Sequence, residues 1–181
     1  MNSIPSDVAK EFCNLCNWTY ECWLTYRRLF DDNNHTESTI VKAGYFMERL
    51  SKITQEYVLL QICKLHDPAI QGNSLNLTID YIVRFGGWGP DEERIQNIVS
   101  QLTTLFEKIK PVRSKIVVHN DLLTLMNTTE LGKFPKDLDV KYFLMLQELV
   151  NAVSQKWLDG PYSFNDLAGA GSISSACSIN R

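Results

Sequence analysis

An arginine and a histidine stand six residues apart in the stretch KIKPVRSKIVVHND, residues 108–121. A histidine such as His119 titrates near neutral pH and can act as a general acid or base. The guanidinium group of Arg113 can hold a phosphoryl group with a planar pair of donors. Lys110 and Lys115 belong to a group of four cations within eight residues. These residue types together suit the binding or cleavage of a polyanion such as RNA.

The spacing of Arg113 and His119 decides how they could act together. Six residues of an ideal helix turn the direction by about 240°, so the two side chains would not lie on one side of a helix. Two copies of the helix, packed about a two-fold axis, could each contribute one arginine and one histidine to a shared cleft. Two plainer interpretations stay open. The cations can form an ordinary solvated helix face, and His119, three residues beyond Ile116, can be a hydrogen-bonded core residue on an apolar stripe.

Hydrophobic periodicity predicts the elements that would carry this stretch. The expected helices span residues 6–30, 39–65, 76–85, 90–119 and 138–158, with Ser6 and Asn76 as candidate N-caps. Pro111 predicts a bend near residues 107–110, because proline removes a helix hydrogen bond. The apolar stripes expected to be buried on the first, second and last long helices are Val8, Phe12, Leu15, Thr19, Cys22, Tyr26 and Leu29; Phe46, Leu50, Ile53, Tyr57 and Leu60; and Leu146, Leu149, Val150, Val153 and Trp157.

Two short segments between the helices need interpretation. Residues 71–75, QGNSL, are expected to form a loop, and residues 76–85 a helix rather than a strand, since no other segment offers a strand partner. The stretch GGWGPDEE, residues 86–93, is not expected to hold phosphate. Its acidic residues would repel an anion at the helix N-terminus, so a turn with Pro90 at the first helical position is favoured.

Composition bounds the class of protein. A chain of 181 residues with 44% apolar residues and a net charge of −3 predicts one globular domain without a generally basic surface. We expect an all-α antiparallel bundle of four to five main helices over residues 1–160 and a flexible tail over 161–181. The sequence shows neither an apolar membrane span nor a secretory signal, which favours a cytoplasmic protein that binds no membrane. Five cysteines, including a C-x-x-C at Cys13 and Cys16, are interpreted as core residues in a reducing compartment.

At this point the residues resemble a known family. The stretch RSKIVVH, residues 113–119, is similar to the R-x4–6-H signature of the HEPN superfamily, all-α domains found in toxin and phage-defence systems. Ahead of it stand YFMERLSKITQEYVLLQICKLHDPA, with a K/R-L-x-D-P-like turn, and GNSLNLTIDYIV, which resembles the N-L-S/T-I segment before the motif helix. This order is similar to the branch related to abortive-infection proteins of the U type, over roughly residues 43–157.

The resemblance implies a homodimer formed along the motif helix and a metal-independent endoribonuclease that needs no cofactor. It assigns catalysis to Arg113 and His119 and implies a 2′,3′-cyclic phosphate product. Lys110 and Lys115 could hold the flanking RNA backbone, and Asn120 could orient the histidine or simply end the helix. The position after the arginine, commonly Asn, Asp or His in the family, is Ser114, which donates a hydrogen bond but carries no charge. A cognate antitoxin or nucleotidyltransferase is a further partner to consider.

Two other classes of function stay open beside the ribonuclease. The chain could be a catalytically silent HEPN-like module that binds a partner protein or a nucleotide, or a structural bundle in which the Arg–His pair joins helices. The four tryptophans, Trp18, Trp23, Trp88 and Trp157, are interpreted as packing anchors. His35 and His66 are interpreted as capping or surface residues, and no group of side chains predicts a metal site.

Overall fold

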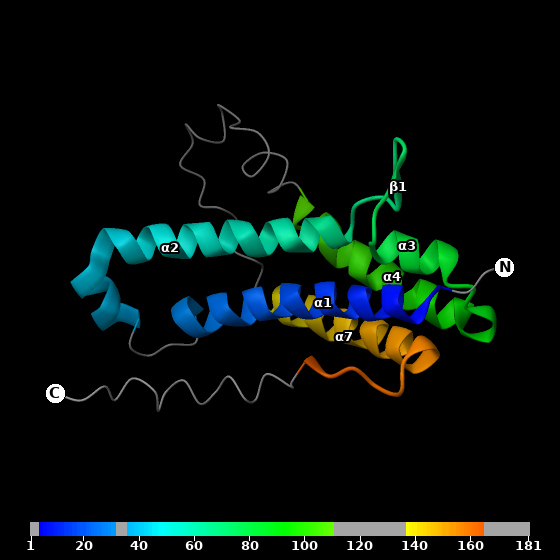
Figure 1. Ribbon diagram of the computed structural model, residues 1–181. Helices are drawn as coiled ribbons and strands as arrows, with labels where there is room; N and C mark the ends of the chain where they lie inside the picture. The colour runs from blue at the N-terminus through cyan, green and yellow to red at the C-terminus, as the bar shows by residue number, and fades with distance from the viewer. Residues whose placement is uncertain (1–3, 32–35, 111–136, 165–181) are drawn as a thin grey trace.

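The computed structural model describes residues 4–31, 36–110 and 137–164, with side chains from residue 44 onward in the second of these ranges. It confirms the predicted all-α class. Helix α1 (Ser6–Tyr26) and helix α2 (Thr36–Leu65) lie side by side and run antiparallel (Figure 1). Helix α7 (Leu138–Trp157) packs on α1 and on α4 (Glu92–Glu107). Short helix α3 (Ile79–Phe85) lies between the second and fourth helices in the chain.

The core forms where the helices meet. Its largest fully buried side chains are Tyr142, Phe12, Ile62, Ile82, Ile95, Leu102, Leu146, Leu149, Val150 and Val153. The predicted stripe of α7 is confirmed, since four of its five members are buried and Trp157 packs against the core. Trp23 ties α1 to α7, because its indole N–H donates to Asp139 at 2.9 Å and its ring stacks on Phe143 at 4.5 Å.

Helix α1 buries a face rotated from the predicted one. Its buried residues are Ala9, Phe12, Cys13, Cys16, Thr19 and Trp23. Leu15 and Leu29 of the predicted stripe are 36% and 38% exposed, so that part of the prediction was wrong. Small residues explain the rotation, because Ala9 and the two cysteines let neighbouring helices approach closely. Ser6 makes no side-chain capping bond, and the helix ends in a π-helical turn over Arg27–Asp31.

Helix α2 departs further from its prediction. It begins at Thr36 and is kinked at Gly44, whose φ of 21° is a conformation that side chains disfavour. Phe46, Ile53 and Tyr57, predicted to be buried, are 65%, 60% and 42% exposed. The core side of the helix carries other apolar residues instead, namely Val58, Leu59, Ile62 and Cys63.

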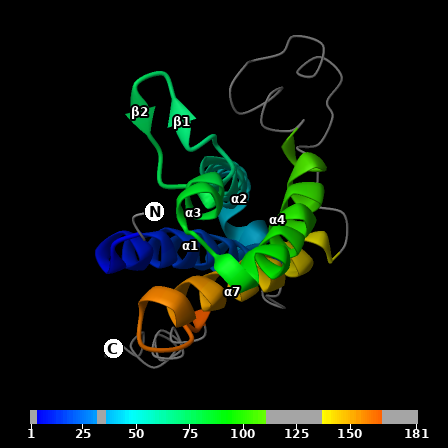
Figure 2. The ribbon, with the colours of Figure 1, turned by 90° about the vertical axis from the view of Figure 1, so that its right-hand side faces the viewer.

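Between α2 and α4 the structure differs from the prediction in two respects. Ile70–Gln71 and Ser74–Leu75 pair as a small antiparallel β-hairpin, which projects from the bundle (Figure 2), where a loop was predicted. The α3 helix is confirmed, but its cap is Thr78, whose hydroxyl accepts from the Tyr81 N–H at 3.3 Å. Asn76, the predicted cap, instead donates its side-chain amide to the Pro68 carbonyl at 3.0 Å.

The glycine-rich stretch forms a packed turn, as predicted. A short 3-10 turn over Gly89–Asp91 leads into α4, with Pro90 among its first residues. Trp88 is buried and donates its indole N–H to the Ile82 carbonyl at 3.1 Å. Lys156 of α7 lies 4.8 Å from the Trp88 ring centre and donates to the Gly87 carbonyl. The turn therefore joins α7 to the start of α4.

Residues at the predicted boundary between domain and tail pack on the bundle. Phe164 is 3% exposed and stacks on Tyr20 at 5.0 Å. Its N–H donates to the Gln147 side chain at 2.8 Å, and the same side chain donates to the Tyr162 carbonyl. Residues 161–164 are thus anchored, and the rest of the predicted tail lies outside the described residues.

Candidate functional site

The Arg–His motif begins where the described part of the chain stops. Arg113, Ser114, Lys115, His119 and Asn120 lie outside the described residues, so their predicted roles stay predictions. Of the predicted site residues the structure places Lys110. Its ammonium group lies 2.8 Å from a carboxylate oxygen of Glu107, and both side chains are 53% exposed. An exposed ion pair of this kind is weak and leaves the ammonium group accessible to water.

Helix α4 ends in the stretch where Pro111 was expected to bend a longer helix, and the predicted continuation to His119 lies outside the described residues. Its last regular residue is Glu107, four residues before Pro111. The Lys108 and Ile109 N–H groups then bond to carbonyls three residues back, at 3.3 and 2.8 Å. Bonds of this 3-10 type tighten a helix end. Ile109 and Phe106 are 3% and 6% exposed, so the last turn is held on the core.

A partly buried histidine secures this end of α4. The His66 ring, at the end of α2, lies parallel to the Phe106 ring with 4.1 Å between centres. Its Nε2 lies 3.0 Å from the hydroxyl of Tyr142, a fully buried residue of α7. Burial lowers the pKa of His66 to about 4, so the ring is neutral at pH 7. The His66 side chain thus joins the end of α2 to Phe106 of α4 and to Tyr142 of α7.

Sequence interpretation missed this role. His66 was expected to be a capping or surface residue because it stands at a helix end, and that expectation was wrong. A signal was available, because His66 lies four residues beyond Ile62 and three beyond Cys63, both fully buried. Residues at these spacings share a helix face.

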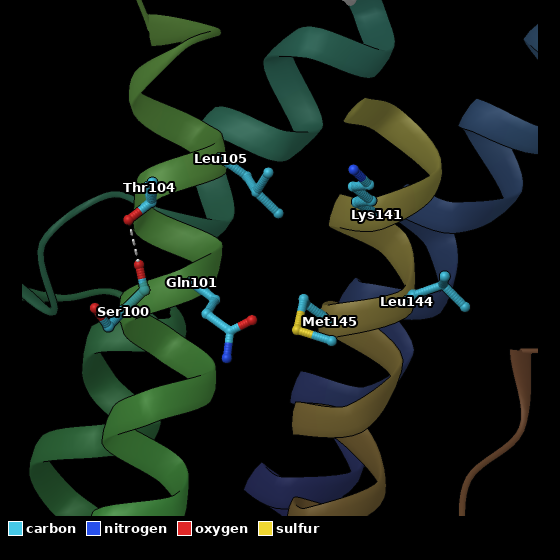
Figure 3. A pocket seen from close by; sticks show the side chains of 7 residues that line it. All are labelled: Ser100, Gln101, Thr104, Leu105, Lys141, Leu144 and Met145. Carbon is cyan, nitrogen blue, oxygen red and sulfur yellow. Dashed lines mark hydrogen bonds between the residues drawn. The ribbon is translucent and has the colours of Figure 1, made fainter. Parts of the chain in front are cut away.

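A shallow groove runs along α4 beside α7, upstream of the motif (Figure 3). Leu105, Leu144 and Met145 form its apolar part, and Leu144 is 59% exposed. The groove has a volume of about 350 Å³ and a polar rim formed by Ser100, Gln101, Thr104 and Lys141. The Thr104 hydroxyl donates to the Ser100 carbonyl at 2.9 Å and so presents mainly its methyl group. An apolar surface of this kind on α4 and α7 can accept another polypeptide.

Comparison with protein families decides the kinship of the chain. The HEPN family model described as AbiU2 matches residues 7–172. The chain belongs to the AbiU2 family of HEPN proteins. The match includes all but the first residue of the described helices and the whole Arg–His stretch, which confirms the resemblance seen in the sequence. No curated protein and no solved structure matches the chain.

AbiU2 membership connects the chain with abortive infection, and it gives the described fold a context. Two of the stretches on which the resemblance rested fall largely on α2 and α3, and the third, RSKIVVH, lies outside the described residues. The last residues described before the motif, up to Lys110, follow the turn of α4 in which Phe106 packs on His66, whose ring contacts Tyr142.

The remaining candidate residues have structural roles in this AbiU2 chain. Cys13, Cys16 and Cys63 are buried and form no disulfide, as the core interpretation predicted. Burial raises the pKa of Cys13 to about 12, which makes its thiol a poor nucleophile and metal ligand. Within residues 4–31, 36–110 and 137–164, no group of three or more His, Cys, Asp or Glu side chains could hold a metal ion. Trp18 differs from the other tryptophans, because 49% of it is exposed.

A membrane-spanning element was not expected, and the described helices contain none that is both long and apolar enough to cross a bilayer.

Proposed function

We propose that this AbiU2-family protein is a metal-independent endoribonuclease that acts in the cytoplasm as a phage-defence or toxin effector. The observation that carries the proposal is the family match over residues 7–172, which includes RSKIVVH at residues 113–119. In this proposal two copies associate along the motif helix, and each contributes Arg113 and His119 to one cleft.

The proposed chemistry uses the nucleophile that RNA itself carries. The 2′-hydroxyl loses its proton to the imidazole of His119 and attacks the adjacent phosphorus, forming the 2′,3′-cyclic phosphate. The bond from phosphorus to the 5′-oxygen breaks, and a protonated imidazole in the same cleft gives that oxygen its proton. Arg113 stabilises the negative charge that builds on the phosphorane. No step requires a metal ion.

The other candidate residues would bind substrate. Lys110 and Lys115 flank the arginine and can contact neighbouring phosphates. The half-exposed ion pair between Lys110 and Glu107 is compatible with this role, because an exposed pair is easily exchanged for a phosphate contact. Ser114 can donate a hydrogen bond to a phosphate oxygen, and Asn120 can orient the imidazole of His119.

A second function is favoured by the groove between α4 and α7. Leu144 and Met145 give it an apolar lining, which suits a partner protein such as a cognate antitoxin or a nucleotidyltransferase. Ser114, at the position after the motif arginine, carries no charge. A catalytically silent HEPN module that uses this face for binding is therefore the alternative.

The test compares purified wild-type protein with Arg113→Ala and His119→Ala variants, incubated with mixed RNA in EDTA. Arg94→Ala is the matched control, since Arg94 is an exposed arginine at the other end of α4. We expect cleavage by the wild type and the control, and a loss of about a hundredfold or more in both motif variants. The product should carry a 2′,3′-cyclic phosphate.

Two other outcomes have defined meanings. Absence of cleavage by a folded, associated wild-type protein would reject the nuclease and favour the binding module. Variants that lose their helical circular dichroism would assign the Arg–His pair a structural role. Binding of a nucleotide or partner protein that survives Arg113→Ala but not Leu144→Glu would favour the groove as the functional surface.

A further inference from the structure

Helix α2 presents an apolar stripe on the outside of the monomer. Phe46, Ile53 and Tyr57 are 65%, 60% and 42% exposed, and Leu50 between them is partly exposed. We call these four residues the α2 seam. They follow one another by four, three and four residues, which places them on one side of the helix. Four large apolar side chains in a row are unusual on the surface of a monomer and mark an interaction surface.

The seam is distinct from the face by which α2 joins the bundle. Val58, Leu59, Ile62 and Cys63 occupy the buried face. Exposed Trp18 of α1 lies beside the seam, with its indole N–H 3.4 Å from the Tyr57 hydroxyl, and so extends the apolar surface. The seam starts two residues after the kink at Gly44, where α2 changes direction.

The spacing of the seam selects the kind of partner. The spacing of four, three and four residues reads the same from Phe46 to Tyr57 as from Tyr57 to Phe46. Two copies of α2 that pack antiparallel about a two-fold axis would therefore match Phe46 with Tyr57 of the other copy, and Leu50 with Ile53. An axis crossing between Leu50 and Ile53 places every apolar residue of the seam against another.

Charges along the seam are complementary in the same arrangement. Arg49 precedes Leu50 and Glu56 precedes Tyr57, so both lie along the same edge of the seam. An antiparallel two-fold pair brings identical edges together, which sets Arg49 of one copy opposite Glu56 of the other. A parallel pair would instead oppose this edge to the one with Met47 and Thr54, which are uncharged. The Arg49 guanidinium already lies over the Tyr45 ring at 4.5 Å, which limits its freedom.

We infer that the α2 seam is an interface between two copies of this chain, packed antiparallel with Arg49 facing Glu56 across a two-fold axis. This interface differs from the motif-helix interface of the proposed function and does not depend on it. His66 lies 14 to 15 residues from the axis, and Phe106 of α4 stacks on it. At 1.5 Å per residue the two α4 ends would lie about 40 Å apart, too far for one cleft.

A chain with both interfaces would form assemblies larger than a dimer. The seam covers about three helical turns, so we expect a modest affinity in the micromolar range. Sedimentation velocity over a concentration series spanning that range measures the assembly. Ile53→Glu should weaken it at least about tenfold, because it puts two carboxylates beside the axis. Leu75→Glu is the matched control, since Leu75 is an aliphatic residue of the hairpin with 65% exposure.

A charge exchange tests the orientation. Arg49→Glu and Glu56→Arg should each weaken the assembly, and the double variant should restore it toward wild type, which a seam used in any other direction would not produce. Circular dichroism confirms that each variant is folded. A wild-type monomer at all concentrations, or an assembly that ignores Ile53→Glu, overturns the inference. Failure of the double variant to recover overturns the antiparallel register.

These outcomes separate the two proposals. If the motif helix also associates, Ile53→Glu converts a larger assembly into a dimer. If it does not, the same variant converts a dimer into a monomer. A dimer unchanged by Ile53→Glu would reject the seam and leave the motif-helix interface standing, and RNA cleavage by the Ile53→Glu protein would show that the nuclease needs no seam.

Discussion

The partly buried His66, which packs against the end of α4, predicts an acid-sensitive fold. His66 has a pKa of about 4 in the folded protein and an ordinary value of 6.5, which applies when the chain unfolds. Between these values the unfolded state binds one more proton than the folded state. The contribution of the neutral ring to the free energy of unfolding is therefore fully present above pH 6.5. It decreases as the pH falls and is lost below pH 4.

The magnitude follows from the two pKa values. The loss in free energy of unfolding amounts to about 2 kcal/mol at pH 5 and about 3 kcal/mol at pH 4, a large fraction of the stability of an ordinary domain. The His66→Gln variant isolates the part of this pH-dependent loss that comes from His66. Glutamine does not titrate and does not stack on Phe106. The variant should therefore have a lower free energy of unfolding than wild type at pH 7, but this free energy should fall less on acidification.

Urea unfolding followed by circular dichroism at several pH values measures the effect. Other titrating groups, His35 and His119 among them, are present in both proteins and cancel in the difference. We expect the gap between wild type and His66→Gln to narrow by about 2 kcal/mol from pH 7 to pH 5. Parallel pH dependences for the two proteins, or a His66 pKa near 6.5 measured by NMR, would refute the reasoning.

Three further changes test the packing. Gly86→Ala should destabilise the fold by about 2–4 kcal/mol in thermal or urea unfolding, because its methyl carbon would lie 2.4 Å from the Ile82 carbonyl oxygen. Tyr142→Phe removes the hydroxyl that pairs with His66 and should cost about 1–2 kcal/mol by the same measurement, with the helical spectrum retained. Leu144→Glu should leave the free energy of unfolding within about 0.5 kcal/mol of wild type, since Leu144 is mostly exposed. The same variant should weaken any association along α4 that sedimentation detects.

Sequence periodicity located the helices better than it assigned their faces. The α7 stripe was predicted correctly because one side of that helix is apolar and the other polar. Helix α2 has two apolar sides, the seam and the face with Val58 and Ile62, and a periodic pattern does not say which neighbour covers which side. The hairpin was missed although its signal is in the sequence, since Gly72 and Asn73 form a two-residue loop of the kind that joins paired strands, and Gly72 has a φ of 59°.

The family was predictable from the sequence, whereas the roles of Arg113 and His119 lie outside the described residues and stay predictions. The types and spacing of Arg113 and His119 carried the resemblance, which the family match confirmed. The packing at the end of α4 depends on contacts between residues far apart in the chain, such as His66 with Phe106 and Tyr142, and such contacts leave no local pattern. Only the position of His66 on a buried helix face hinted at them.

The two histidines near the motif would affect an activity profile in different ways. In the proposed mechanism, acidification would protonate the imidazole of His119 and so remove the general base. Acidification also weakens the His66 contact that holds the end of α4, over a pH range that overlaps the first. A fall in RNA cleavage below pH 6 therefore has two possible origins. If the fall reflects catalysis, it should follow the same curve in His66→Gln protein under conditions where both proteins stay folded. If the fall reflects loosening of α4, the His66→Gln protein should cleave RNA more slowly than wild type at pH 7. Its cleavage rate should then change less between pH 7 and lower pH.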